Sequence, residues 1–110
     1  MGAIYVQDDD MIDYTPTADV PAGAVVVIGD LVGVAKKPIP ANTLGSLAVE
    51  GLFDCPKAAG AGSAIPGGTK VYWDPVANVA TATAGTLKYL GKTTEDAADA
   101  DTTVRVRLQQ

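Results

Sequence analysis

Two runs of apolar residues separated by Gly29-Asp30 constrain the fold of this chain more than any other feature. Residues 25–28 read Val-Val-Val-Ile and residues 31–34 read Leu-Val-Gly-Val, so both runs are rich in β-branched side chains that favour strands. Glycine at the first position of a two-residue loop suits a type II′ turn, because only glycine takes the required positive φ without a Cβ clash. The stretch therefore predicts a β-hairpin. The predicted pairs are Ile28 with Leu31, Val27 with Val32, Val26 with Gly33, and Val25 with Val34.

This hairpin offers no polar side to water. Successive pairs fall on opposite faces of the ribbon. One face carries Val25, Val27, Val32 and Val34, and the other carries Val26, Ile28, Leu31 and Gly33. A hairpin with one solvated face should alternate apolar with polar residues, which this one does not do. Both faces must be covered, either by the chain's own loops or a second sheet, or by a second subunit or a larger surface. Cover by a second subunit predicts a homotrimer or homodimer.

The composition favours an all-β fold. The chain has 110 residues, which suffices for one domain with its own core. It contains 12 Gly and 7 Pro but only 5% aromatic residues, a composition typical of short strands joined by tight turns. No helical stripe of apolar residues stands out, although residues 93–101 could close into one helical turn. We expect residues 1–110 to form a single small β-barrel or β-sandwich of antiparallel strands joined by Pro/Gly turns.

One turn motif occurs three times. An apolar residue precedes proline, and a residue that tolerates positive φ follows two positions after the proline, as in type II-like turns. The three copies are Val20-Pro21-Ala22-Gly23, Ile39-Pro40-Ala41-Asn42 and Ile65-Pro66-Gly67-Gly68. In addition, Gly51 interrupts the strand-like run 46–53, where a bulge or a close backbone approach is expected. These motifs predict turns and strands, and they contain no candidate catalytic residues.

The end of the sequence predicts a half-buried strand. Residues 103–108 alternate as Thr-Val-Arg-Val-Arg-Leu. Val104, Val106 and Leu108 should point inward, while Arg105 and Arg107 should point outward. The two arginines are either a solvated face or a docking surface for acidic groups of a partner.

The chain lacks the residues that most enzymes use. It contains no histidine, which removes the usual general base and the commonest metal ligand. Cys55 is the single cysteine, and without a base it is interpreted as a small packing residue. Residues 62–70 are rich in glycine but have Thr69 before Lys70 and a strand-like run after it, so they are not a phosphate-binding P-loop. We therefore expect no catalytic site, no metal site, no cofactor and no small-molecule substrate.

Other ligand and location classes are also disfavoured. The formal net charge of −5 argues against a nucleic-acid surface, because cations supply most of the affinity for phosphates. Asp8, Asp9 and Asp10 lack the alternating oxygen ligands, the glycine and the final glutamate of an EF-hand calcium loop. The sequence shows no signal peptide and no apolar run near the ~20 residues needed to span a membrane. These features predict a protein made in a host or producer cytoplasm that binds neither membrane nor metal.

Several turn-and-strand motifs occur together along nearly the whole chain. They are Tyr5-Val6-Gln7, Asp10-x-Ile12-Asp13-Tyr14-Thr15, Pro21-Ala22-Gly23, residues 25–35, Val49-Glu50-Gly51-Leu52-Phe53, Gly67-Gly68, Val71-Tyr72-Trp73-Asp74, Leu90-Gly91 and residues 101–108. As a set they resemble DUF2190, a family of small structural proteins of tailed phages. Some members carry a label as recombinases, which the missing P-loop contradicts here. Other members resemble capsid cement, or decoration, proteins.

The resemblance implies a cement protein that oligomerises on the outer surface of the phage head and stabilises contacts between major capsid subunits. Its implied partners are the major capsid protein and further copies of itself, and its location is the exterior of the virion. A head fibre or receptor-binding appendage is the alternative, and a recombination-related nucleic-acid protein is a third class. The candidate interface residues are Val25, Val26, Val27, Ile28, Leu31, Val32, Arg105 and Arg107.

Overall fold

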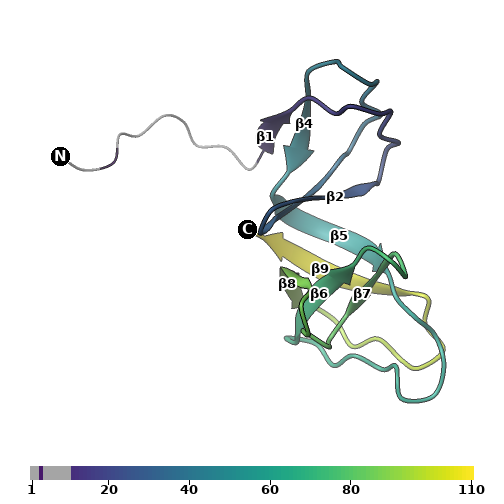
Figure 1. The fold of residues 1–110 in the computed structure, drawn as a ribbon. Helices are drawn as coiled ribbons and strands as arrows, with labels where there is room; N and C mark the ends of the chain where they lie inside the picture. Colours follow the sequence, from purple (N-terminus) through teal and green to yellow (C-terminus); the bar gives the residue numbers. More distant parts are fainter. Residues whose placement is uncertain (1–2, 4–10) are drawn as a thin grey trace.

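The computed structural model describes residue 3 and residues 11–110, and over these residues the chain forms nine β-strands and no helix (Figure 1). The all-β prediction is therefore confirmed. The helical turn considered for residues 93–101 is wrong, because these residues form the end of a strand, bends, one isolated bridge and a hydrogen-bonded reverse turn over 98–101. The three aspartates at positions 8–10 lie outside the described residues.

The strands form two antiparallel sheets. The first sheet has the order β1-β4-β3-β2, and the second has the order β5-β9-β8-β6-β7. The bounds in the first sheet are β1 (Met11–Tyr14), β2 (Val25–Ile28), β3 (Leu31–Val34) and β4 (Gly45–Ala48). Those in the second are β5 (Glu50–Pro56), β6 (Lys70–Asp74), β7 (Val79–Thr81), β8 (Lys88–Thr93) and β9 (Thr103–Gln109). Both sheets are open, so of the two predicted architectures the sandwich fits and the closed barrel does not.

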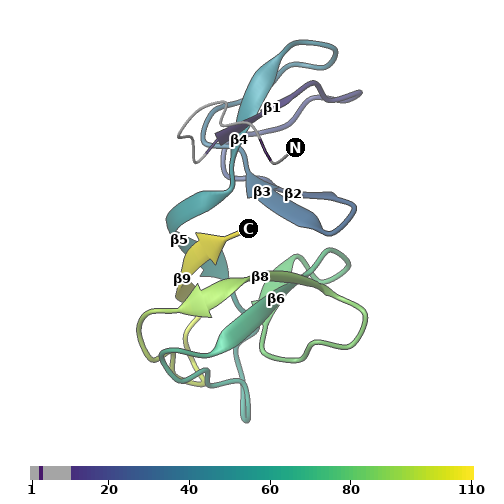
Figure 2. The ribbon, with the colours of Figure 1, turned by 90° about the vertical axis from the view of Figure 1, so that its left-hand side faces the viewer.

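The chain passes from the first sheet to the second between β4 and β5, which are separated only by Val49. In Figures 1 and 2 the first sheet lies above the second, and this crossing joins them. Gly51 has a φ of 135°, a conformation that residues with a Cβ rarely adopt. The bulge expected at Gly51 is absent, because Gly51 pairs with Leu108 of β9 in regular register. The expected close backbone approach is absent as well, since the atoms nearest to a Cβ at Gly51 belong to the Phe53 side chain.

The central hairpin has the predicted register. Val25 pairs with Val34 and Ile28 pairs with Leu31, as the two-residue turn requires. Gly29 has a φ of 60°, and the φ of Asp30 is not positive. A positive φ at the first turn residue alone is the pattern of a type II′ turn. The hairpin formed by β2 and β3 is thus specified by its own local sequence.

The three proline-containing turns also follow the prediction. The residue two positions after each proline has positive φ, with values of 85° at Gly23, 60° at Asn42 and 79° at Gly68. The apolar residues before the prolines form isolated bridges. Val20 pairs with Ile39, so two copies of the motif bind each other, and Ile65 pairs with Ala97. The repeated motif therefore anchors loops as well as turning the chain.

Two hydrophobic clusters lie on the two faces of the hairpin. Val32 and Val34 belong to the main core, which also takes its buried residues from β4 and from all strands of the second sheet. The strand residues are Ala48, Cys55, Val71, Trp73, Ala80, Leu90, Val104, Val106 and Leu108, and the isolated bridge between Ile65 and Ala97 adds two more. On the other face, Val26 packs against a small cluster of Ala35, Ile39 and Leu47. The chain's own residues thus cover most of both hairpin faces. That residues 1–110 form a single domain stays a prediction.

The strand predicted at the end of the sequence is β9. Its residues alternate between exposed and buried, with Val104, Val106 and Leu108 inward and both arginines outward, which confirms the predicted pattern. Because β9 lies between β5 and β8, it holds the second sheet together rather than forming its edge.

Gln110 joins the two sheets directly. Its side-chain Nε2 donates to the backbone oxygens of Tyr89 and Leu90, each at 2.9 Å. Its Oε1 accepts a hydrogen bond of 2.9 Å from the backbone N–H of Val32 in the hairpin. One amide group thus bridges β3 of the first sheet and β8 of the second. An exposed ion pair of 2.6 Å between Lys88 and Asp30 connects the hairpin turn to the same strand.

Candidate interaction surfaces

The metal-ligating residue types and the cysteine of the described residues bear on the chemistry that the surface could support. No group of three or more His, Cys, Asp or Glu in the described part of the chain could hold a metal ion. Cys55 is buried in the main core, as predicted for a packing residue. Burial, with a smaller contribution from the nearby Asp54 charge, raises the pKa of the Cys55 thiol to about 11. A thiol with this pKa is protonated at neutral pH and is a poor nucleophile.

The glycine-rich loop before β6 uses its amide groups within the protein. The backbone N–H of Gly67 donates to Asp96 Oδ1 at 2.7 Å, and that of Gly68 donates to the carbonyl of Thr93 at 2.7 Å. Thr69 N–H donates to Thr93 Oγ1 at 3.0 Å. These donors are already occupied, so the loop does not form the free nest of N–H groups that a phosphate would need.

Lys57 is a buried cation that sequence reasoning missed. Only 5% of its surface is exposed. Its Nζ donates to the carbonyls of Ala58 and Asp101 and to Ser63 Oγ, at 2.8, 3.1 and 3.3 Å. The ammonium group has three protons and three acceptors, so it crosslinks loops and keeps no donor for a ligand. Its position in a run of small loop residues gave no indication of this role.

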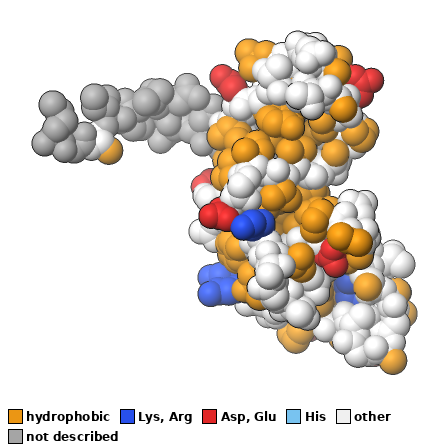
Figure 3. All heavy atoms as spheres, in the orientation of Figure 1, with side chains coloured by type: hydrophobic (Ala, Val, Ile, Leu, Met, Phe, Trp, Pro, Cys, Tyr) orange, Lys and Arg blue, Asp and Glu red, His pale blue; other side chains and the backbone are white. Residues whose placement is uncertain are grey.

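The candidate interface residues of the hairpin separate into buried and exposed sets. Val32 is fully buried in the main core, and Val25 and Val26 are half-buried against the two clusters. Leu31 is also half-buried. Val27 and Ile28, at the tip, are 38% and 40% exposed. Figure 3 shows hydrophobic side chains over the first sheet and at its junction with the second, with only scattered charged side chains among them. The tip is therefore the part of the hairpin that can meet a partner.

The free edge of β2, a strand of four residues, carries neither the charged side chains nor the proline that often protect an edge strand. β2 is the last strand of its sheet, and its sequence is Val-Val-Val-Ile. Edge strands of monomers usually carry charges or proline, or are very short. The other three edges follow that rule, since β1 contains Asp13, β5 contains Glu50 and Pro56, and β7 has three residues. The edge of β2 is thus a surface suited to pairing with another strand.

The hairpin register identifies the backbone groups at this edge. In a two-residue hairpin the pair next to the turn is hydrogen-bonded, and bonded pairs then alternate with non-bonded pairs. Val27 and Val25 belong to non-bonded pairs, so their N–H and C=O groups point away from β3. The bond from Val32 N–H to Gln110 agrees with this alternation, because Val32 is the partner of Val27. Val25 and Val27 therefore present donors and acceptors along the free edge.

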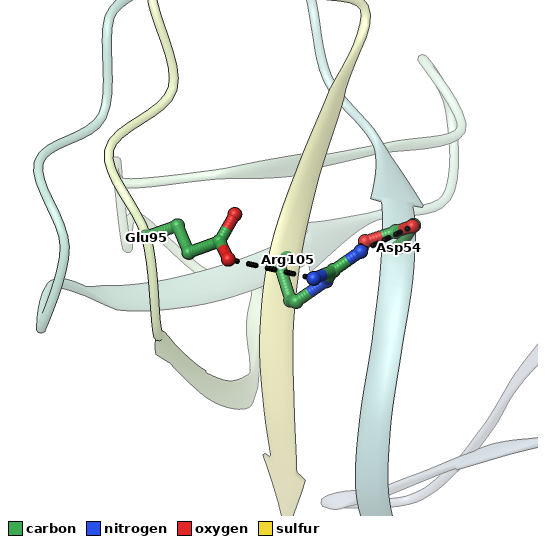
Figure 4. Close-up of polar contacts among 3 residues, drawn as sticks. All are labelled: Asp54, Glu95 and Arg105. Atoms are coloured by element: carbon green, nitrogen blue, oxygen red, sulfur yellow. Dashed lines mark hydrogen bonds and ion pairs between the residues drawn. The ribbon is translucent and has the colours of Figure 1, made fainter.

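Arg105 is neutralised by neighbouring carboxylates. It forms a two-point ion pair with Asp54, at 2.9 and 3.2 Å, and a longer contact of 3.4 Å with Glu95 (Figure 4). The hydrogen bond from Arg105 lowers the pKa of Asp54. All three side chains are well exposed, so this cluster contributes little to stability. Of the two arginines predicted to face outward, Arg105 has its charge neutralised by carboxylates of the same chain.

Arg107 lies in a different environment. Lys92 on β8 is its direct cross-strand partner, and Lys70 on β6 is the partner of Lys92. The three side chains form one row across adjacent strands, which we call the cationic row, and each residue is exposed. No carboxylate among the described residues lies within ion-pair distance of any of them. Like charges directly opposite each other in a sheet are destabilising, so the fold alone does not explain this row.

The comparisons with known proteins give one family. A family model described as phage cement protein matches residues 6–108, which is nearly the whole chain. Neither the curated proteins nor the solved structures contain a significant match.

Proposed function

Because this chain belongs to the phage cement protein family, we propose that it binds the outer surface of the phage head and joins neighbouring major capsid subunits. The observation that carries the proposal is the length of the family match, which covers both sheets and the crossing between them. A structural role is supported by the interior of the described part of the chain, where every buried side-chain nitrogen and oxygen has a hydrogen-bond partner and no cluster of metal ligands is present.

The proposed mechanism is mechanical. A capsid shell under pressure from packed DNA opens where neighbouring capsomers separate. A subunit bound across such a boundary must lose its buried interface before the boundary can open, and a standard protein interface buries about 1,600 Å². Many copies on one head add their contributions, and an oligomer that grips several capsid subunits at once gains further from avidity.

Mass spectrometry of purified virions, followed by a particle reconstruction, tests this function. We expect the chain in the particles, with one copy at every equivalent site of the capsid lattice. Absence from the particles would overturn the proposal. A few copies confined to one vertex would instead support the head-fibre or receptor-binding alternative.

We further propose that copies of the chain associate through β2. The unprotected edge supplies backbone donors and acceptors, and the exposed side chains of Val27 and Ile28 at the tip supply apolar surface. Pairing two such edges would satisfy the backbone groups and cover the tip, which would remove a surface prone to aggregation. Val32 is not part of this interface, because it is fully buried within its own chain.

Two substitutions in β2 should convert the oligomer into a folded monomer. Ile28→Asp places a charge on the exposed tip, and Val27→Pro removes an outward N–H without breaking a bond to β3. Light scattering at micromolar concentration should give a dimer for the wild type, because one β2 edge pairs with one other, and a monomer for both variants, with unchanged β-sheet circular dichroism. The matched control is Val76→Asp, which charges an apolar side chain that is 95% exposed in the turn between β6 and β7 and is not part of β2. This control should keep the oligomer, whereas a monomeric wild type would contradict the proposed association.

A further inference from the structure

The cationic row of Lys70, Lys92 and Arg107 has no counter-charge within the described chain. We propose that this row is the surface through which the protein docks on an acidic patch of the capsid shell. The inference rests on the proposed cement function and adds to it the face of the molecule and the chemistry of the partner.

The strand register places these charges next to each other. Lys70 pairs directly with Lys92, and Lys92 pairs directly with Arg107, so the row crosses β6, β8 and β9. Adjacent strands in a sheet are about 4.8 Å apart, and directly opposed side chains share one face. All three side chains are exposed and point away from the main core, whose buried residues alternate with them.

The balance of charge in the whole chain makes the row unusual. The protein has 13 acidic and 8 basic residues, so carboxylates are abundant. Asp54 and Glu95 form ion pairs with Arg105, two residues away on β9, but no described carboxylate lies within ion-pair distance of the row. An uncompensated positive strip on an acidic protein is complementary to a negative surface and would orient the protein toward it.

The surroundings of the row favour a protein partner over a nucleic acid. Leu52, opposite Arg107 on β5, is 58% exposed. On the other side, Tyr72 projects from the same side of β6 as Lys70 and packs edge-to-face on Tyr89, with ring centroids 6.1 Å apart. Arginine and tyrosine are enriched at protein interfaces, and an exposed leucine gains from an apolar contact that a phosphate backbone does not supply. The net charge of −5 also repels a polyanion.

The test compares two variants that remove the same charge. Lys70→Gln/Lys92→Gln removes two lysines from the row, and Lys36→Gln/Lys37→Gln removes two exposed lysines from the turn after β3. Binding to purified phage heads assembled without the protein is measured by co-sedimentation over a range of salt concentrations. We expect the row variant to bind about tenfold or more weakly than the wild type at low salt, with a flatter salt dependence. The turn variant should bind like the wild type.

The outcomes separate this inference from the cement function. If the wild type fails to bind heads, the cement function itself is overturned. If the wild type binds and the row variant binds equally well, the function stands and the docking surface is overturned. Binding of the wild type to a short DNA duplex, lost in the row variant while binding to heads is kept, would also overturn it. Removing adjacent like charges should leave the row variant at least as stable as the wild type, so weaker binding would not reflect unfolding.

Discussion

Gly91→Ala should destabilise the protein by at least about 3 kcal/mol, at the upper end of the cost of overpacking. A Cβ at this position would overlap the backbone oxygen of Arg107 and would lie 2.9 Å from its carbonyl carbon. The obstruction is the backbone of β9, which is hydrogen-bonded on both sides and cannot move aside as a flexible side chain could. Since small domains have about 5–15 kcal/mol of total stability, we expect a large loss of folded protein. Urea denaturation followed by tryptophan fluorescence measures the change.

Gly67→Ala is the matched control for this prediction. A Cβ on Gly67 would lie 3.4 Å from the nearest atoms, in ordinary contact with Asp96 and Glu95, and its backbone does not require glycine. The change in the free energy of unfolding should stay within about 0.5 kcal/mol. Equal denaturation midpoints for Gly91→Ala and the wild type would contradict the close packing of β8 on β9.

Gln110→Ala should have the second largest effect, a loss of roughly 2–4 kcal/mol from three hydrogen bonds of about 0.5–1.5 kcal/mol each. The substitution leaves the N–H of Val32 and the carbonyls of Tyr89 and Leu90 without their side-chain partner. Because these groups belong to different sheets, the hairpin should also loosen from the second sheet. Faster amide hydrogen exchange at Val32, together with a lower denaturation midpoint, is the expected result.

Two further variants sharpen this test. Gln109→Ala removes the same side chain from an exposed position at the end of β9, and it should be nearly neutral. Gln110→Glu keeps the shape but directs a carboxylate at two carbonyl oxygens, so it should be no more stable than the alanine variant at neutral pH. A neutral Gln110→Ala would show that the two sheets hold together without this amide.

The sequence by itself determined those features that depend on residues close together in the chain. The register of the central hairpin follows from Gly29, because a two-residue turn leaves one way to pair the flanking strands. The positive φ values at Gly23, Asn42 and Gly68 follow from the residues that tolerate them. The alternation in β9 likewise separates its buried side chains from its arginines. Together with the composition, these local rules were sufficient for the all-β class.

Only the tertiary structure decided which strands became neighbours, because pairing between distant segments is not encoded in local periodicity. Lys70, Lys92 and Arg107 are far apart in the sequence, and the order of strands in the second sheet alone makes them one row. The same order places carboxylates within ion-pair distance of Arg105 but not of Arg107, although the two arginines look equivalent in the alternating pattern.

Tertiary structure also decided which residues pack against the two faces of the hairpin. From the sequence, either the chain itself or another copy could cover the two apolar faces of the hairpin. In the structure each face packs against a separate hydrophobic cluster of the same chain, and only the tip stays exposed. Gln110 gave no indication of its role, because a polar side chain at the end of a strand is normally solvated. Its three partners come from segments that meet only when the two sheets pack together, so its function depends on the assembled fold.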